Sequence, residues 1–152
     1  MIRKMTENDY EIFLELTKEF YVFPVVESPI NDEEIESTFK HIIEDSPYID
    51  GYLIFNKKDV VGFFIIAFGF ATEYGGTILF FEDLYIREKY QGNGIGRKIF
   101  KFVEEKYQDE VYAIKLEVGR SNYRAKTLYQ KLGYKESKYV TMIKKIWKNV
   151  KL

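Results

Sequence analysis

Apolar residues recur at helical spacing in four stretches of the chain, with polar residues between them. In the first stretch Phe13, Leu16 and Phe20 fall on one face, which assigns them to a core. Asn31 opens the second stretch as a capping residue, and Gly133 ends the last one in the usual C-terminal role of glycine. The pattern predicts helices at residues 6–20, 31–44, 95–107 and 121–133.

Short apolar runs separated by turn signals predict a β-sheet beside these helices. Residues 56–59, Asn-Lys-Lys-Asp, are a hairpin signature, and Gly75-Gly76 marks another turn, so residues 50–86 form an antiparallel meander. The strand, helix and strand between residues 77 and 118 imply a parallel crossover. We predict strands at residues 1–5, 52–55, 60–70, 77–86 and 112–118, with one or two closing strands within residues 134–147. The expected fold class is α+β, with a mostly antiparallel central sheet of six to seven strands flanked by about four helices.

The chain has 152 residues, the size of one domain, so residues 1–152 are expected to form a single unit around one core. Cysteine is absent and His41 is the only histidine, so we expect no disulfide and no metal site. The first residues are too polar for a signal peptide, and no apolar run approaches the ~20 residues of a membrane span. These features predict a cytoplasmic protein that does not contact a membrane.

The charges are distributed unevenly, although the net charge is only −1. Residues 1–76 carry 6 Lys and Arg against 15 Asp and Glu, whereas residues 77–152 carry 17 against 9. The small net charge argues against binding of nucleic acid through its phosphates. One interpretation is that the basic half binds a polyanionic cofactor and the acidic half binds a cationic second substrate. The alternative is two solvated surfaces of opposite net charge.

Residues 91–96 read Gln-Gly-Asn-Gly-Ile-Gly and lie between an apolar strand and a helix. Glycines at the start of a helix let several backbone N–H groups point at one anion, although a tight turn would also need them. The dinucleotide fingerprint fails because Arg97 occupies the position of its third glycine. The nucleoside-triphosphate loop fails because no Gly-Lys-Ser/Thr follows. A different phosphate ligand is therefore indicated.

The same six residues match the Q/R-x-x-G-x-G/A signature of the GNAT superfamily of acetyl-CoA-dependent N-acetyltransferases. Residues 122–134 resemble a second segment of that family, N-x-x-A-x-x-L-Y-x-x-x-G-F/Y, and the resemblance extends over nearly the whole chain. It implies a sheet in which two parallel strands separate at the cofactor site. It also implies an enzyme that transfers the acetyl group of acetyl-CoA to an amine.

The resemblance implies a set of residues that bind acetyl-CoA. Backbone N–H groups of residues 91–96 would hold the pyrophosphate, and residues 84–86 would pair with the pantetheine. Arg97, Lys98 and Arg124 are candidates for the remaining phosphate, and Asn122 would combine a cofactor contact with its role as a helix cap. The full set of expected cofactor-binding residues is Leu84, Tyr85, Ile86, Gln91, Gly92, Asn93, Gly94, Ile95, Gly96, Arg97, Lys98, Asn122 and Arg124.

Two residues are expected to be catalytic, Glu82 and Tyr129. Glu82 lies in an apolar strand on the parity of Leu84, where desolvation would raise the pKa of its carboxyl group. The resemblance gives it the role of general base, and a salt bridge or a solvated strand end is the alternative. Periodicity alone makes Tyr129 a core ring, whereas the resemblance makes it the proton donor to the departing thiolate.

The acceptor is expected to be a small cationic amine such as a polyamine, because diamine acetyltransferases carry a similar Glu-Asp run. An aminoglycoside, a protein or peptide amine, and a non-catalytic acyl-CoA-binding module remain alternatives. The residues expected to bind the substrate are Tyr21, Phe23, Glu27 and Glu82, with Asp32, Glu33 and Glu73 as further acids of the pocket.

The closing strand, with Met142, Ile146 and Trp147, belongs either to the core or to a dimer interface, and a homodimer is favoured.

Overall fold

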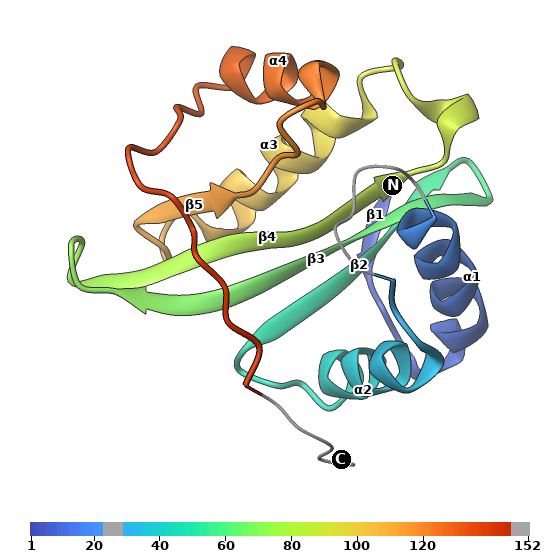
Figure 1. Ribbon diagram of the computed structural model, residues 1–152. Coiled ribbons are helices and arrows are strands. Elements are labelled where there is room, and N and C mark those ends of the chain that lie inside the picture. Colours follow the sequence, from blue (N-terminus) through green and yellow to red (C-terminus); the bar gives the residue numbers. More distant parts are fainter. Residues whose placement is uncertain (23–28, 147–152) are drawn as a thin grey trace.

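Five strands form one sheet in the order β1-β2-β3-β4-β5 (Figure 1). The structure is a computed structural model that describes residues 1–22 and 29–146. The strands are β1 (Ile2–Lys4), β2 (Ile49–Asn56), β3 (Asp59–Ala71), β4 (Gly76–Ile86) and β5 (Ala113–Leu116). The first four pair antiparallel, and only β4 and β5 run parallel. The predicted meander and the predicted parallel crossover are both confirmed.

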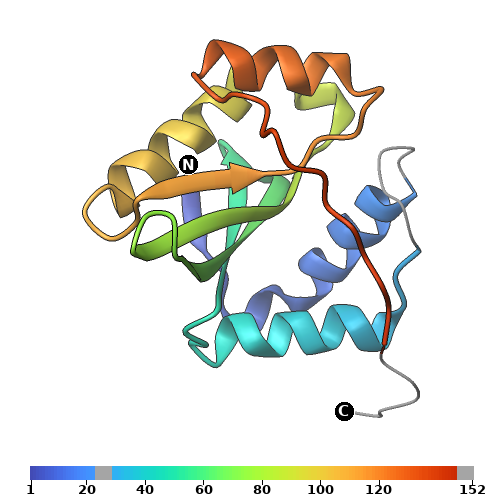
Figure 2. The same cartoon turned by 60° about the vertical axis from the view of Figure 1, so that its left-hand side comes forward.

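Four α-helices cover the two faces of this sheet (Figure 2). The helices are α1 (Tyr10–Tyr21), α2 (Asp32–Ile43), α3 (Ile95–Tyr107) and α4 (Tyr123–Lys131), with short 3-10 turns η1 (Glu7–Asp9) and η2 (Glu88–Tyr90). Helices α1 and α2 lie on one face, and α3 and α4 lie on the other. The four predicted helices are confirmed. Their apolar stripes pack against the cores on the two faces of the sheet, which is why helical spacing of apolar residues predicted them.

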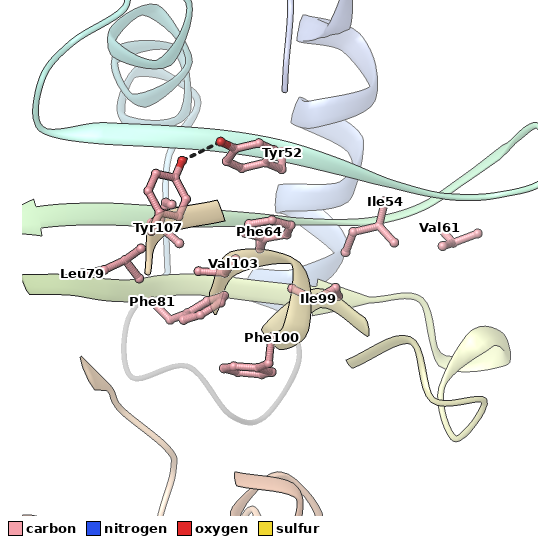
Figure 3. Close-up of a cluster of buried hydrophobic side chains, with 11 residues drawn as sticks. Tyr52, Ile54, Val61, Phe64, Leu79, Phe81, Ile99, Phe100, Val103 and Tyr107 are labelled. Carbon is pink, nitrogen blue, oxygen red and sulfur yellow. Dashed lines mark hydrogen bonds between the residues drawn. The ribbon is translucent and has the colours of Figure 1, made fainter. Parts of the chain in front are cut away.

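The alternation of side chains along β3 builds one core on each face of the sheet. Phe63 and Ile65 pack against α1 and α2, whereas Phe64 and Ile66 pack against α3. Figure 3 shows the α3 side, where Tyr52 donates a hydrogen bond of 2.6 Å to the Tyr107 hydroxyl. Because both of its faces are covered, β3 carries no polar residue from Val60 to Phe70.

One prediction about the sheet was wrong. Residues 134–147 were expected to add one or two closing strands, yet no strand occurs within the described residues 134–146, and β5 is shorter than residues 112–118. A strand requires a partner for its backbone groups, and the described part of this segment pairs with no other strand. The sheet therefore has five strands in place of six to seven.

Candidate active site

Strands β4 and β5 separate halfway along β4. They pair only from Ile78 opposite Ala113 to Phe81 opposite Leu116. Strand β4 then continues to Ile86 with β3 as its neighbour on the other side. Beyond Phe81, the side of β4 that faced β5 thus carries backbone N–H and C=O groups that no described strand pairs with, and an extended ligand can satisfy them.

A β-bulge lies at this point of separation. Ile66 is opposite Phe81 but Ile65 is opposite Asp83, so Glu82 is an extra residue on β4. Phe81 and Leu84 consequently pack into the same core. Glu82 was predicted on the parity of Leu84. The bulge interrupts strict alternation at this residue, so parity alone does not assign the Glu82 side chain to a face.

A cleft of about 390 Å³ opens where the two strands part. Its lining combines acids, aromatic rings and a helix cap, and it draws on five elements, α1, β4, α3, β5 and α4. Its lining residues are Phe20, Tyr21, Phe81, Glu82, Asp83, Leu84, Phe100, Leu116, Glu117, Val118, Gly119, Asn122 and Tyr129. The cleft brings together both residues that the sequence predicted as catalytic.

Glu82 lines this cleft and is exposed to solvent. Desolvation by the surrounding protein raises the pKa of its carboxyl group, and the negative charge of Glu117 across the cleft raises it further. A carboxylate with a raised pKa accepts a proton more readily. Its position and its basicity both fit a general base.

Asp83 follows Glu82 and is deeper in the protein. Burial, with a smaller effect from the charge of Glu82, raises the pKa of Asp83 to about 6, although the Tyr21 hydroxyl opposes this rise. Burial and the charges of Asp83 and Glu82 in turn raise the pKa of Tyr21 to about 12. The C-terminus of α1 thus places a neutral hydroxyl beside two carboxylates.

Tyr129 approaches the cleft from α4, on the far side from α1. Its ring packs edge-on against Phe100 at a centroid distance of 5.4 Å. Burial raises the pKa of its hydroxyl, so the group is protonated at neutral pH. The ring belongs to the core while the residue also lines the cleft, so both roles considered for it from the sequence are compatible with the structure.

The glycine-rich residues 91–96 turn the chain from β4 into α3. Gly92 and Gly94 have φ angles of +82° and +77°, which residues with side chains rarely adopt. Gly94 is the N-cap of α3, so the first N–H groups of that helix point out of the turn. The Gln91 amide donates a 2.7 Å hydrogen bond to the Ile86 carbonyl and fixes the turn to the end of β4. Backbone N–H groups in this arrangement at a helix N-terminus are of the kind that binds anions.

Helix α4 lies against this turn. A Cβ on Gly92 would be 3.0 Å from Arg124, and one on Gly96 would be 3.0 Å from Leu128, so the small residues permit close approach. Arg124 also donates a 3.4 Å hydrogen bond to Gln91. The guanidinium therefore reaches over the glycine turn, where a phosphate would meet it.

The remaining predicted cofactor residues have less distinctive positions. Arg97 and Lys98 are exposed on the first turn of α3, and Asn122 caps α4 by accepting a 3.1 Å hydrogen bond from Ala125. The Tyr85 side chain points to the α1 face and donates a 3.0 Å hydrogen bond to Glu19, which leaves only its backbone for a cofactor contact. Asn93 is exposed in the turn, and Ile95 packs into the α3 core.

Several acids predicted to line the substrate pocket are elsewhere in the structure. Asp32 forms an exposed ion pair with Lys18 at 3.0 Å, and Glu73 pairs with Lys115 at 3.0 Å. Glu33 lies exposed in the first turn of α2 and is not among the residues that line the cleft. Phe23 and Glu27 lie outside the described residues.

Sequence reasoning did not include Asp83 and Glu117 among the binding residues, although both line the cleft. Strict alternation along a strand would turn Asp83 away from Glu82, and the bulge on β4 interrupts that alternation. Glu117 carries a detectable signal, since it ends an alternating apolar strand next to the family's Asn122 segment. Only the separation of the strands explains why an acid there faces one on β4.

Comparison with known proteins gives one family. The model of the Acetyltransferase (GNAT) family matches residues 10–134, most of the chain. The D-amino-acid N-acetyltransferase HPA3 of Saccharomyces cerevisiae is 28% identical over 142 residues, covering 91% of this chain and 86% of that protein. A thialysine N-epsilon-acetyltransferase of Bos taurus is 39% identical over 75 residues, covering 49% of this chain and 44% of that protein.

Solved structures share the fold at lower identity. The structure of AAC(6')-Iy in complex with the bisubstrate analogue CoA-S-monomethyl-acetylneamine superposes with a TM-score of 0.79 at 14% identity, covering 95% of this chain and 97% of that one. A ribosomal-protein-alanine N-acetyltransferase from Brucella melitensis gives 0.73 at 15% identity, covering 96% and 99%. Both similarities concern the fold alone.

Proposed function

The chain belongs to the GNAT family of acetyltransferases, and we propose that it transfers the acetyl group of acetyl-CoA to a primary amine of a small molecule with more than one positive charge, such as a polyamine. The observation that carries this proposal is the grouping of Glu82, Asp83 and Glu117 in one cleft at the point where β4 and β5 part. Among the described residues that line this cleft there is no Lys or Arg. Its uncompensated negative charge selects a cation.

The residues present fit acetyl-CoA, the donor that this family uses. The turn at residues 91–96 offers free N–H groups at a helix N-terminus for the pyrophosphate, with Arg124 above it. The open side of β4 from Leu84 to Ile86 offers backbone groups for the pantetheine amides. When bound, acetyl-CoA supplies an activated thioester. Its acetyl end would point toward Glu82, because both binding segments lead to the cleft.

The residues of the cleft divide the proton transfers between them. The Glu82 carboxylate accepts a proton from the ammonium group of the acceptor, directly or through water, and so frees the lone pair that attacks the thioester carbonyl. Tyr129, protonated at neutral pH, donates its phenolic proton to the departing sulfur. Asp83 and Glu117 bind the second positive charge of the acceptor and hold its reacting amine near Glu82.

The acidic lining of the cleft also predicts which amines are poor acceptors. The two relatives named above act on D-amino acids and on thialysine, compounds that carry a carboxylate with their amine. In the described part of this chain, a carboxylate that entered the cleft would meet three acids and no cation. Repulsion between a carboxylate on the acceptor and these acids disfavours binding, so we infer a preference for amines without a carboxylate.

A matched series of amines tests the proposal in a thiol-release assay with acetyl-CoA. The acceptors are 1,5-diaminopentane, pentylamine, which lacks the second charge, and lysine, which adds a carboxylate. We expect kcat/KM to be highest for the diamine, by at least about 10-fold, since one hydrogen-bonded charge pair contributes roughly 1.5–3 kcal/mol. Equal rates with pentylamine would contradict the assignment of the acidic cleft to a second charge. Binding of acetyl-CoA without turnover of any amine would instead favour a non-catalytic acyl-CoA-binding module.

A further inference from the structure

Arg87, the residue that follows β4, is held by two carboxylates of α1. Its Nε and Nη2 atoms donate hydrogen bonds of 3.0 Å and 2.8 Å to the two oxygens of Glu19, and Nη2 also contacts Glu15. On the side of the sheet, the Arg87 backbone N–H donates a 2.8 Å bond to the Val61 carbonyl, and Nη1 donates a 3.1 Å bond to the Val60 carbonyl. The α1 clamp, formed by Arg87, Glu15 and Glu19, thus fastens α1 to the ends of two strands.

The geometry of this clamp is stronger than that of an ordinary surface ion pair. A guanidinium that bonds both oxygens of one carboxylate fixes the orientation of both groups, whereas a single contact between exposed charges contributes little. The side chains of Arg87 and Glu19 are only 23% and 34% exposed. The hydrogen bond from Arg87 holds the pKa of Glu19 below its usual range, so the pair stays charged at neutral pH. The clamp therefore sets the position of the C-terminal end of α1.

The same end of α1 delivers a side chain to the acidic cleft. Tyr21 is the last residue of the helix and lines the cleft. Its hydroxyl is close enough to Asp83 to oppose the rise in the pKa of that carboxyl group. The ring of Phe20 packs against Tyr21 at a centroid distance of 5.1 Å and against Tyr85 at 5.8 Å. A shift of this helix end would carry Tyr21 away from Asp83.

Tyr85 connects the clamp to the segment of β4 assigned to the pantetheine. Its hydroxyl donates a 3.0 Å hydrogen bond to Glu19. Tyr85 is opposite Phe63 and Asp83 is opposite Ile65, and both partners on β3 belong to the core beneath α1. Residues directly opposite each other in a sheet share a face, so the side chains of Asp83 and Tyr85 both point toward α1. One face of this short piece of β4 thus carries an acid of the acceptor site and an anchor of the helix.

We propose that Arg87 is a positioning residue for the acceptor: the α1 clamp holds Tyr21 beside Asp83 and so maintains the pocket for the second positive charge. This inference rests on the proposed function. Arg87 is not among the described residues that line the cleft, so it acts on the acceptor through α1. A pocket for a charge depends on the exact placement of its polar groups. Loss of the clamp is therefore expected to weaken binding of the second charge while the base, the acid and the cofactor segments keep their positions.

Steady-state kinetics with two amines test this role. In Arg87→Gln, KM for 1,5-diaminopentane should rise about 10-fold, because a hydrogen-bonded charge is less well placed. KM for pentylamine, which lacks the second charge, and the Kd for acetyl-CoA measured by calorimetry should change little. Glu19→Ala breaks the clamp from the other side with a residue that favours a helix, and it should give the same result. This second variant keeps the test decisive where Arg87→Gln does not fold.

A similar ion pair at the opposite end of α1 provides the matched control. Arg3 donates hydrogen bonds of 2.7 Å and 2.8 Å to Asp9, the N-cap of the helix. Arg3→Gln should lower the melting temperature but leave KM for both amines at the wild-type value. Tyr21→Phe should reproduce the effect of Arg87→Gln on the diamine. Since the two residues act on the same pocket, the double variant should be no worse than the more affected single variant.

Three results would overturn the proposal. They are an unchanged KM for the diamine in both clamp variants, an equal rise in KM for the two amines, and an equal rise for the diamine in Arg3→Gln. Amide hydrogen exchange gives a readout that does not require turnover: the last turn of α1 should exchange faster in Arg87→Gln, and unchanged exchange would also overturn the proposal. A wild type with no preference for the diamine contradicts the proposed function itself, and the exchange measurement still decides whether the clamp fixes α1.

Discussion

Replacing Asp83 with Asn is expected to stabilise the fold at pH 8 while it weakens the enzyme. The pKa of Asp83 rises from 3.8 to about 6, chiefly through burial. Each unit of pKa corresponds to about 1.4 kcal/mol, so the charged form is disfavoured by up to about 3 kcal/mol in the folded state. Partial access to solvent lowers this figure, and we expect a gain of ~1–3 kcal/mol for the Asn variant.

The sign of the pH dependence follows from the raised pKa. Below about pH 4 Asp83 is protonated in both the folded and the unfolded chain, so its burial does not reduce the free energy of unfolding. As the pH rises through about 6, the buried carboxyl group must ionise, and the free energy of unfolding falls. Urea unfolding of the wild type and Asp83→Asn at pH 4 and pH 8 measures the difference. Asp109→Asn is the matched control, because Asp109 is exposed on the loop after α3. The gain in free energy of unfolding of Asp83→Asn over the wild type should be larger at pH 8 than at pH 4. An equal gain at both pH values would contradict a raised pKa for Asp83.

Three other variants test the roles of the remaining residues. Tyr129→Phe should lower kcat about 100-fold with little change in the Kd for acetyl-CoA measured by calorimetry, and an unchanged kcat would remove Tyr129 as the acid. Glu117→Gln removes a charge that raises the pKa of Glu82, so the acidic limb of the pH–rate profile should move to lower pH; a limb that stays in place would contradict this coupling. Arg124→Ala should raise the Kd for acetyl-CoA about 10-fold, whereas the control Lys101→Ala, on the exposed side of α3, should not. Equal effects of the two variants would indicate only a general loss of positive charge.

Much of the fold was predictable because its signals are local. The helical spacing of Phe13 and Leu16 and the turn signal at residues 56–59 depend on a few neighbouring residues, and both were confirmed. The first family motif correctly placed the glycine turn at the start of α3. The second correctly placed α4 after β5. Local periodicity is a reliable guide where one face of an element is buried.

The parts that were not predictable depend on pairing between distant segments. The bulge at Glu82 arises from the register of β3 and β4, and it decides that Asp83 and Glu82 both line the cleft. The grouping of Glu117 with them requires β4 and β5 to separate. Residues 134–147 have the composition of a strand, but composition does not provide a neighbouring strand to pair with, and no strand forms in the described residues 134–146.

The measurement that most directly tests the account is kcat/KM of Glu82→Gln with acetyl-CoA and 1,5-diaminopentane. Glutamine keeps the size and polarity of the side chain but cannot accept the proton of the ammonium group. We expect a fall of about 100-fold or more, largest near neutral pH, whereas Glu105→Gln on the exposed side of α3 should leave the rate unchanged. A Glu82→Gln enzyme that retains the wild-type rate and pH profile would contradict the assignment of Glu82 as the base.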